Sequence, residues 1–155
     1  MKVDETDRRI LALLQENADL SVAEIGTRVG LSSTPCWRRI QNLEKQGVIR
    51  KKVALLDRRA IDVPLTVFVM IRTSQHSDVW LETFAKGVSE IPEVLEFYRM
   101  SGTVDYLLRI VVPSVDAYDA VYKRLISIAD LAEVSSSFAM EEIKYTTALP
   151  LHYVG

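Results

Sequence analysis

The chain has 155 residues, which is enough for one domain of ordinary size or for two small ones. Hydrophobic residues make up 48% and charged residues 26%, as in soluble globular proteins, and no apolar run approaches the roughly 20 residues needed to cross a bilayer. The first residues are acidic and lack the apolar stretch of a signal peptide, and the single cysteine excludes an internal disulfide. We therefore expect a cytoplasmic protein.

The net charge of −2 conceals an uneven distribution along the chain. Residues 1–60 contain 12 Lys and Arg against 8 Asp and Glu, a net +4, whereas residues 61–155 contain 7 against 13, a net −6. Such a split indicates that one half meets a polyanion, although chance variation in a solvated surface would also produce it. The positions of the basic residues on the predicted helices have to decide between these two explanations.

Two helices are predicted in the first thirty residues. Asp4 is the expected N-cap of the first helix, which residues 17–19 end. Ser21 and Glu24 have the spacing of a capping box, so the second helix begins at Ser21. Gly30 offers the left-handed residue that lets this helix stop.

A third helix is predicted almost immediately afterwards. Ser32 or Ser33 is its expected cap, Pro35 fits its first turn, and Gly47 ends it. Apolar residues repeat at helical spacing and are expected to face the core, namely Cys36, Ile40 and Leu43. Cys36 has no His or Cys neighbour at ligand spacing, so we interpret it as a core residue and expect no metal site. Three short helices with a tight turn before the last predict a helix-turn-helix.

The opposite face of the third helix carries side chains suited to DNA. Arg suits guanine edges, Gln and Asn suit adenine, and hydroxyls and Lys suit phosphate. The candidate DNA-contacting residues of this region are Ser32, Ser33, Thr34, Trp37, Arg38, Arg39, Gln41, Asn42 and Lys45. Trp37 either packs over the turn or contacts sugar or a thymine methyl group, and the sequence leaves both open. A helical bundle with a solvated basic face would explain the charges, but not the near-absence of acidic residues along this face.

Residues 48–56 alternate loosely and are expected to form a basic wing strand. Arg50, Lys51 and Lys52 are its candidate phosphate contacts. The polar residues 57–63 are the natural boundary, so we predict a DNA-binding domain at 1–60 and a second domain at 61–155.

The second domain repeats the order strand, helix, strand. Strands are predicted at residues 65–72, 94–100, 106–112 and 134–147, with helices capped by Ser77 and Ser114. Two such units of near-equal length predict a ferredoxin-like βαββαβ fold, in which two helices cover one face of a four-stranded sheet. The whole chain is therefore expected to be of the α+β class.

The other face of this sheet is also predicted to be apolar. Phe68 and Met70 lie on the opposite face from Leu65, Val67, Val69 and Ile71, and Leu108 and Ile110 likewise oppose Leu107 and Val111, so helices cannot cover both faces. A second copy of the sheet is the economical cover, so we expect an obligate dimer. The alternative is that the wing or the linker folds over this face.

At this point the chain resembles a known family over essentially its whole length, the Lrp/AsnC or feast/famine transcription regulators. The stretches that carry the resemblance are DETDRRIL at 4–11, AEI at 23–25, GLS at 30–32, PCWRRI at 35–40, LEKQGVI at 43–49, SGTVDY at 101–106 and EIKYTT at 142–147. The resemblance implies a winged helix-turn-helix joined to a ligand-sensing (RAM) domain, with double-stranded DNA as target. It further implies dimers that commonly assemble into octamers and a small effector that is usually an amino acid. We expect no cofactor.

In this family the effector site lies between dimers, near a Gly-x-x-Asp turn. Carried over, the resemblance implies an effector site at Ser101, Gly102, Thr103, Asp105, Tyr106, Thr146 and Thr147. The alternative is that Gly102 only makes the turn and that Asp105 only caps backbone N–H groups. Many members carry proline where Ser33 stands and an acidic residue where Thr103 stands, and the second difference leaves the identity of the effector open.

The sequence therefore predicts a sequence-specific DNA-binding transcriptional regulator and not an enzyme. Some proteins that resemble this family are tetrapyrrole decarboxylases that use histidines of the second domain. Here the only histidines are His76 and His152, neither with a matched acid or base partner, so we expect no catalytic residues. The remaining alternative is a ligand-binding oligomer without a DNA role, whose helix-turn-helix contacts other proteins.

Overall fold

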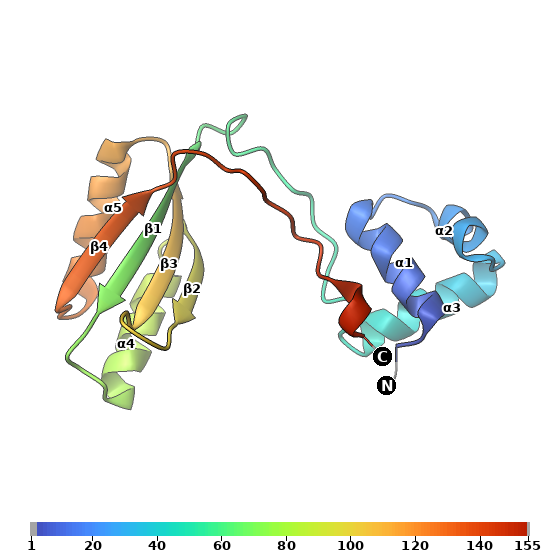
Figure 1. The fold of residues 1–155 in the computed structure, drawn as a ribbon, viewed down its shortest axis with the longest axis horizontal. Helices are drawn as coiled ribbons and strands as arrows, with labels where there is room; N and C mark the ends of the chain where they lie inside the picture. The colour runs from blue at the N-terminus through green and yellow to red at the C-terminus, as the bar shows by residue number, and fades with distance from the viewer. Residues whose placement is uncertain (1–2, 155) are drawn as a thin grey trace. The chain divides into compact units, whose positions relative to one another are not determined.

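The computed structural model describes residues 3–154, which divide into two compact units (Figure 1). The first unit comprises the residues up to 55 together with those from 144 onward, and the second unit comprises residues 56–143. The first unit thus contains a C-terminal segment that the sequence assigned to the second domain. Within the described residues, no helix has the length and apolar character needed to span a membrane.

Three helices form most of the first unit: α1 (Glu5–Glu16), α2 (Val22–Val29) and α3 (Ser33–Lys45). Each begins where the sequence predicts. The Asp4 carboxylate accepts a hydrogen bond from the Asp7 backbone N–H at 2.8 Å, and the Ser21 hydroxyl accepts one from the Glu24 N–H at 3.2 Å. Gly30 ends α2 in the left-handed conformation, with φ 77°. The predicted helix-turn-helix is therefore confirmed.

The core of this unit lies between the three helices. Its buried members are Ile10, Leu11, Ile25, Val29, Cys36, Ile40 and Leu43. Burial raises the pKa of the Cys36 thiol, as expected for a core cysteine. Gly26 allows the turn to pass close to α2, because a Cβ atom there would lie 2.6 Å from the Leu31 carbonyl oxygen. The residue pattern around Gly26 does not predict this close approach.

The second unit is the predicted ferredoxin-like fold. Its elements are β1 (Leu65–Arg72), α4 (Asp78–Ser89), β2 (Val94–Arg99), β3 (Tyr106–Val112), α5 (Val115–Ile128) and β4 (Glu133–Phe138). The strands lie in the order β2-β3-β1-β4, and every neighbouring pair is antiparallel. Both helices are capped by the serines that the sequence indicated, Ser77 and Ser114.

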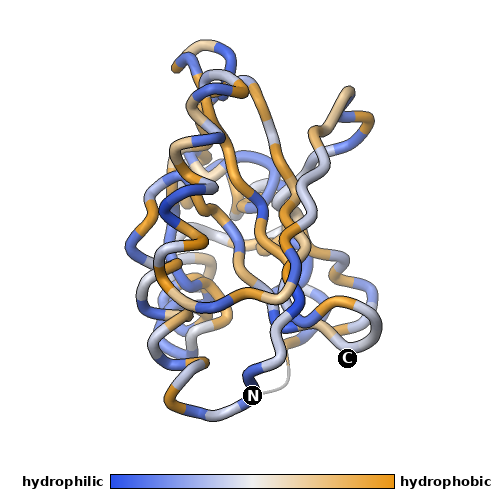
Figure 2. Tube along the Cα trace, turned by 90° about the vertical axis from the view of Figure 1, so that its left-hand side faces the viewer, coloured by the Kyte–Doolittle hydropathy of each residue, from blue (hydrophilic) through white to orange (hydrophobic). Residues whose placement is uncertain are grey.

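The two faces of the sheet alternate residue by residue (Figure 2 colours the chain by hydropathy). Val67, Val69 and Ile71 of β1 are fully buried beneath α4 and α5, together with Leu108 and Ile110 of β3. The residues between them point to the other side of the sheet, which we call the open face.

Two strand predictions were wrong. Residues 48–56 form no strand, because the described chain places no neighbouring strand beside them. The N–H groups of Val48 and Ile49 instead donate to the Leu43 carbonyl at 3.0 and 3.1 Å, which closes the end of α3. The final strand ends at Phe138 and not at residue 147, because its partner β1 begins at Leu65 and offers no further ladder.

Candidate nucleic-acid interface and effector site

The outer face of α3 is set by the burial of its inner face. Cys36 and Leu43 are 0% exposed and Ile40 is 4% exposed, so the helix cannot rotate without breaking the core. The positions opposite this stripe, Thr34, Arg38, Gln41 and Lys45, are exposed, and so is Trp37 beside them. Ser32 and Ser33, at the start of the helix, are exposed as well.

Arg38 and Trp37 are the most available members of this face. Among the described residues, no hydrogen bond or ion pair engages the Arg38 guanidinium, so its donors are free for a base edge or a phosphate. Trp37 is 51% exposed, so the core has not taken up this side chain. The Gln41 amide donates to Glu44 at 3.0 Å, an exposed contact that a base could replace.

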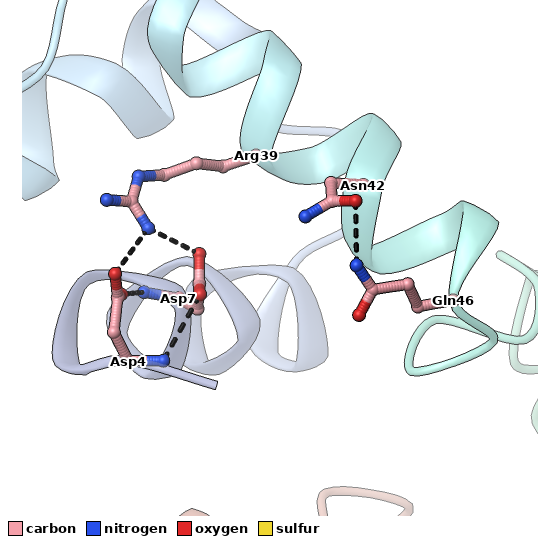
Figure 3. A network of polar contacts seen from close by, with 5 residues as sticks. All are labelled: Asp4, Asp7, Arg39, Asn42 and Gln46. Atoms are coloured by element: carbon pink, nitrogen blue, oxygen red, sulfur yellow. Dashed lines mark hydrogen bonds and ion pairs between the residues drawn. The ribbon is translucent and has the colours of Figure 1, made fainter. Parts of the chain in front are cut away.

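Arg39 lies on the same helix but is already engaged (Figure 3). Its Nη1 atom lies 2.7 Å from Asp4 Oδ2 and 2.8 Å from Asp7 Oδ1, at the start of α1. These carboxylates raise the pKa of the Arg39 guanidinium. The Asp4 carboxyl has a lowered pKa, chiefly because it accepts the hydrogen bond from the Asp7 N–H and also because it pairs with Arg39. Arg39 therefore fastens α3 to α1 in this structure.

The partners of Arg39 are residues that the sequence analysis did not select. Asp7 has an 8% exposed side chain, and a carboxylate in that position requires a partner. The signal available in the sequence was an aspartate at the third position of the helix. The capping of α1 alone also explains an aspartate at this position, so the residue did not indicate an arginine partner. Asn42 is partly engaged too, since its Oδ1 accepts from Gln46 Nε2 at 2.7 Å (Figure 3).

The three basic residues beyond α3 differ in how they are held. Arg50 and Lys51 are exposed, whereas Lys52 Nζ forms an ion pair with Glu44 Oε1 at 3.0 Å. Arg50 and Lys51 are thus the better placed of the three for phosphate contacts.

The candidate effector turn joins β2 to β3. Ser101, Gly102 and Thr103 are exposed, and Gly102 has a φ of 106°, which requires glycine. The turn therefore offers backbone groups and two hydroxyls to solvent.

Asp105 is tied into the sheet beside this turn. Its Oδ2 accepts a hydrogen bond from the Thr73 N–H at 2.8 Å, and its own N–H donates to the Ile71 carbonyl at 2.9 Å. The carboxylate thus caps the end of β1, which is the structural alternative that the sequence left open. Tyr106 is 5% exposed and packs against Trp80 and Phe84.

Thr146 and Thr147 belong to the first unit, whereas the turn belongs to the second. Both threonines are exposed, and they line a surface pocket of about 600 Å³ together with residues of α1 and Leu149. Neither compact unit therefore brings all the predicted effector residues together. Within the described residues, no group of His, Cys, Asp and Glu side chains could hold a metal ion.

Comparison with known proteins identifies related domains in both halves of the chain. A model described as a winged helix-turn-helix DNA-binding domain matches residues 3–50, and one described as the Lrp/AsnC ligand-binding domain matches residues 66–149. The DNA-binding transcriptional activator DecR of Escherichia coli is 49% identical over 150 residues, covering 96% of this chain and 99% of DecR.

Two solved structures share the whole fold. An AsnC family transcriptional regulator from Agrobacterium tumefaciens is 61% identical, with a TM-score of 0.94, over 97% of this chain and 98% of that one. A transcriptional regulator from Neisseria meningitidis, solved as a complex with L-Met, is 38% identical with a TM-score of 0.92, over the same shares of the two chains.

Proposed function

The chain belongs to the Lrp/AsnC family of transcriptional regulators, and from this premise we propose that it reads duplex DNA as a homodimer and responds to an amino acid. We assign it to the cytoplasm, because duplex DNA is its target. The observation that carries the proposal is the outer face of α3, where Arg38 has no partner among the described residues.

DNA recognition follows from this face. An α-helix with exposed Arg, Gln and hydroxyl side chains fits the major groove, and two such helices of a dimer would enter successive grooves about 34 Å apart. Arg38 and Gln41 are the proposed base contacts, and Arg50 and Lys51 supply attraction to phosphates that does not depend on sequence. Arg39 holds the helix in place.

The open face supports the dimer. Phe68 is 37% exposed at its centre, and Met70 and Leu107 lie opposite each other beside it. Apolar residues so arranged favour burial against a second copy of the same face. In the described chain, two ion pairs lie on this face, Arg109 Nη2 to Glu96 Oε1 at 2.8 Å and Arg72 Nη1 to Glu133 Oε2 at 3.2 Å, and each joins neighbouring strands of one sheet. Further assembly of dimers into octamers is part of the same proposal.

The effector proposal rests on the turn between β2 and β3. The relative from Neisseria meningitidis binds L-Met, which makes this amino acid the first ligand to test. In this chain, Ser101, Gly102 and Thr103 would contact the ligand, while Asp105 would keep the turn in place. To act as a switch, the ligand has to bind one assembly state more tightly than another.

A mobility-shift titration tests the proposed function. The probe is the DNA upstream of the protein's own gene at low salt, with a shuffled duplex of equal length as competitor. We expect preferential retention of the upstream duplex. Equal retention of the two duplexes would reject sequence-specific binding, and no retention of either would favour the ligand-binding oligomer without a DNA role.

A further inference from the structure

The chain passes between the two units twice, once at residues 55–56 and once at residues 143–144. The second passage brings the C-terminal segment, residues 144–154, into the first unit. A helix-turn-helix has no need of such an addition, since its three helices already enclose a core. The contacts between this segment and the helices therefore need an explanation other than completing the core.

The segment is anchored to α1 by a pair of hydrogen bonds. The Leu149 N–H donates to Gln15 Oε1 at 2.7 Å, and Gln15 Nε2 donates to the Leu149 carbonyl at 3.2 Å. One amide side chain thus satisfies both backbone groups of one residue, as a neighbouring strand would. This arrangement fixes both the position and the direction of the segment on α1.

A second anchor is apolar. The chain turns into a short 3-10 helix, η1 (Leu151–Tyr153), and Leu151 packs against the buried core of the first unit. Tyr153, on the same turn, is 81% exposed. Within η1, Leu151 is partly buried whereas His152 and Tyr153 are exposed, which is the pattern of a docking contact.

The helix that receives these anchors also holds α3. Gln15 lies near the end of α1, and Asp4 and Asp7 at its beginning bind Arg39 of α3. The C-terminal segment is consequently fixed to the same helix that orients the DNA-contacting residues.

We propose that the docked C-terminal segment is a second tether, which restricts how each first unit can turn on its sensing domain and thereby sets the spacing of half-sites that a dimer accepts. One flexible connection lets a DNA-binding domain reach sites at many separations, whereas two connections, one following α3 and the other anchored on α1, leave fewer orientations. The inference rests on the proposed DNA-binding dimer and adds a determinant of specificity that makes no DNA contact.

The test measures spacing preference in the full-length protein. Half-sites are first obtained by selection from random duplexes, and affinity is then measured for pairs of half-sites on one face of the duplex and for pairs shifted by about half a helical turn, roughly 5 bp. The variants are Gln15→Ala, which removes both hydrogen bonds, and Leu151→Ala, which removes the apolar anchor. Tyr153→Ala is the matched control, and thermal melts followed by circular dichroism check folding.

For the wild type and for Tyr153→Ala we expect the in-phase duplex to bind about 100-fold more tightly than the shifted one, and for the two anchor variants less than about 10-fold. If the anchor variants bind both duplexes more weakly by the same factor, so that the ratio of the two affinities is unchanged, the tether is overturned. A contact that only stabilises the helices lowers the affinity at every spacing alike. A wild type without a spacing preference would also overturn it. A wild type that binds neither duplex would instead reject the proposed function.

Discussion

Arg38 and Arg39 are neighbours in sequence, yet they have different roles in the fold. Arg39 points along α3 toward two carboxylates of α1, whereas Arg38 points away from the core and is left without a partner in the described chain. Residue type and charge are identical at the two positions. Only the direction in which the helix presents them separates a structural arginine from one available to DNA.

Replacing Arg38 tests this separation. Arg38→Ala should cost about 1–3 kcal/mol of specific DNA-binding free energy if the guanidinium reads a base, with little change in binding to shuffled DNA. The measurement is a pair of titrations, against the selected duplex and against the shuffled one. Unchanged affinity for the selected duplex would remove Arg38 from the base-reading residues.

Lys51 should behave differently, because a phosphate contact carries no sequence information. Lys51→Ala should reduce the slope of log affinity against log salt by about one unit while leaving the ratio of selected to shuffled binding intact. Titrations at several salt concentrations measure the slope. Lys52→Ala is the comparison, because Lys52 already pairs with Glu44.

The lowered pKa of Asp4, caused first by the hydrogen bond from the Asp7 N–H and then by the contact with Arg39, predicts a dependence of stability on pH. The pKa of Asp4 in the folded protein lies below its usual value of 3.8, so the contact stabilises the fold above that pH and is lost as the pH falls through the lowered value. Asp4→Asn keeps a good helix cap but removes the charge. The variant should be less stable at pH 7, and denaturant unfolding should show the difference closing as the pH falls through the lowered pKa of Asp4. A gap that stays constant over this range would exclude the charge as its cause.

At the scale of elements, the sequence predicted most of the fold. Capping residues gave the starts of the helices, because Ser21, Ser77 and Ser114 each accept a backbone hydrogen bond at the expected place. An apolar run rich in Val, Ile and Phe predicted β1, and alternation predicted β2. The end of β4 could not be predicted, because it depends on where its partner strand stops, and the sequence of the strand itself does not record that.

The candidate site was predicted less completely. Burial periodicity located the exposed face of α3, since that face depends on local spacing alone. Local spacing could not show that Arg39 is engaged, because Asp4 and Asp7 are distant in sequence. The contact of Gln15 with Leu149 could not be predicted for the same reason, because the two residues are far apart in the sequence.

The open face makes a prediction at this scale. Phe68→Glu would place a charge at the centre of the proposed dimer surface, so the variant should sediment as a monomer at concentrations where the wild type is larger. Val79→Glu is the control, because Val79 lies on α4 and is 74% exposed. A Phe68→Glu protein with unchanged mass would show that another surface joins the copies.

At the scale of the whole molecule, ligand binding should be visible as added stability. An amino acid that binds the folded assembly but not the unfolded chain adds about 2.7 kcal/mol at a hundred times its dissociation constant. Thermal-shift measurements with L-Met and the other common amino acids should therefore identify the effector. Thr103→Ala should reduce the shift if the turn contacts the ligand, and the absence of any shift would contradict an amino-acid effector.

The order in which the units occur along the chain has a consequence for synthesis. The sensing domain is topologically an insertion, since the first unit begins before it and ends after it. A ribosome releases the N-terminal residues first, so the three helices emerge early but lack Leu149 and Leu151 until the second unit has been synthesised. In a nascent chain, the DNA-binding domain therefore cannot be fully anchored before the ligand-sensing domain has been synthesised. Products of premature termination would contain the helix-turn-helix without the anchor.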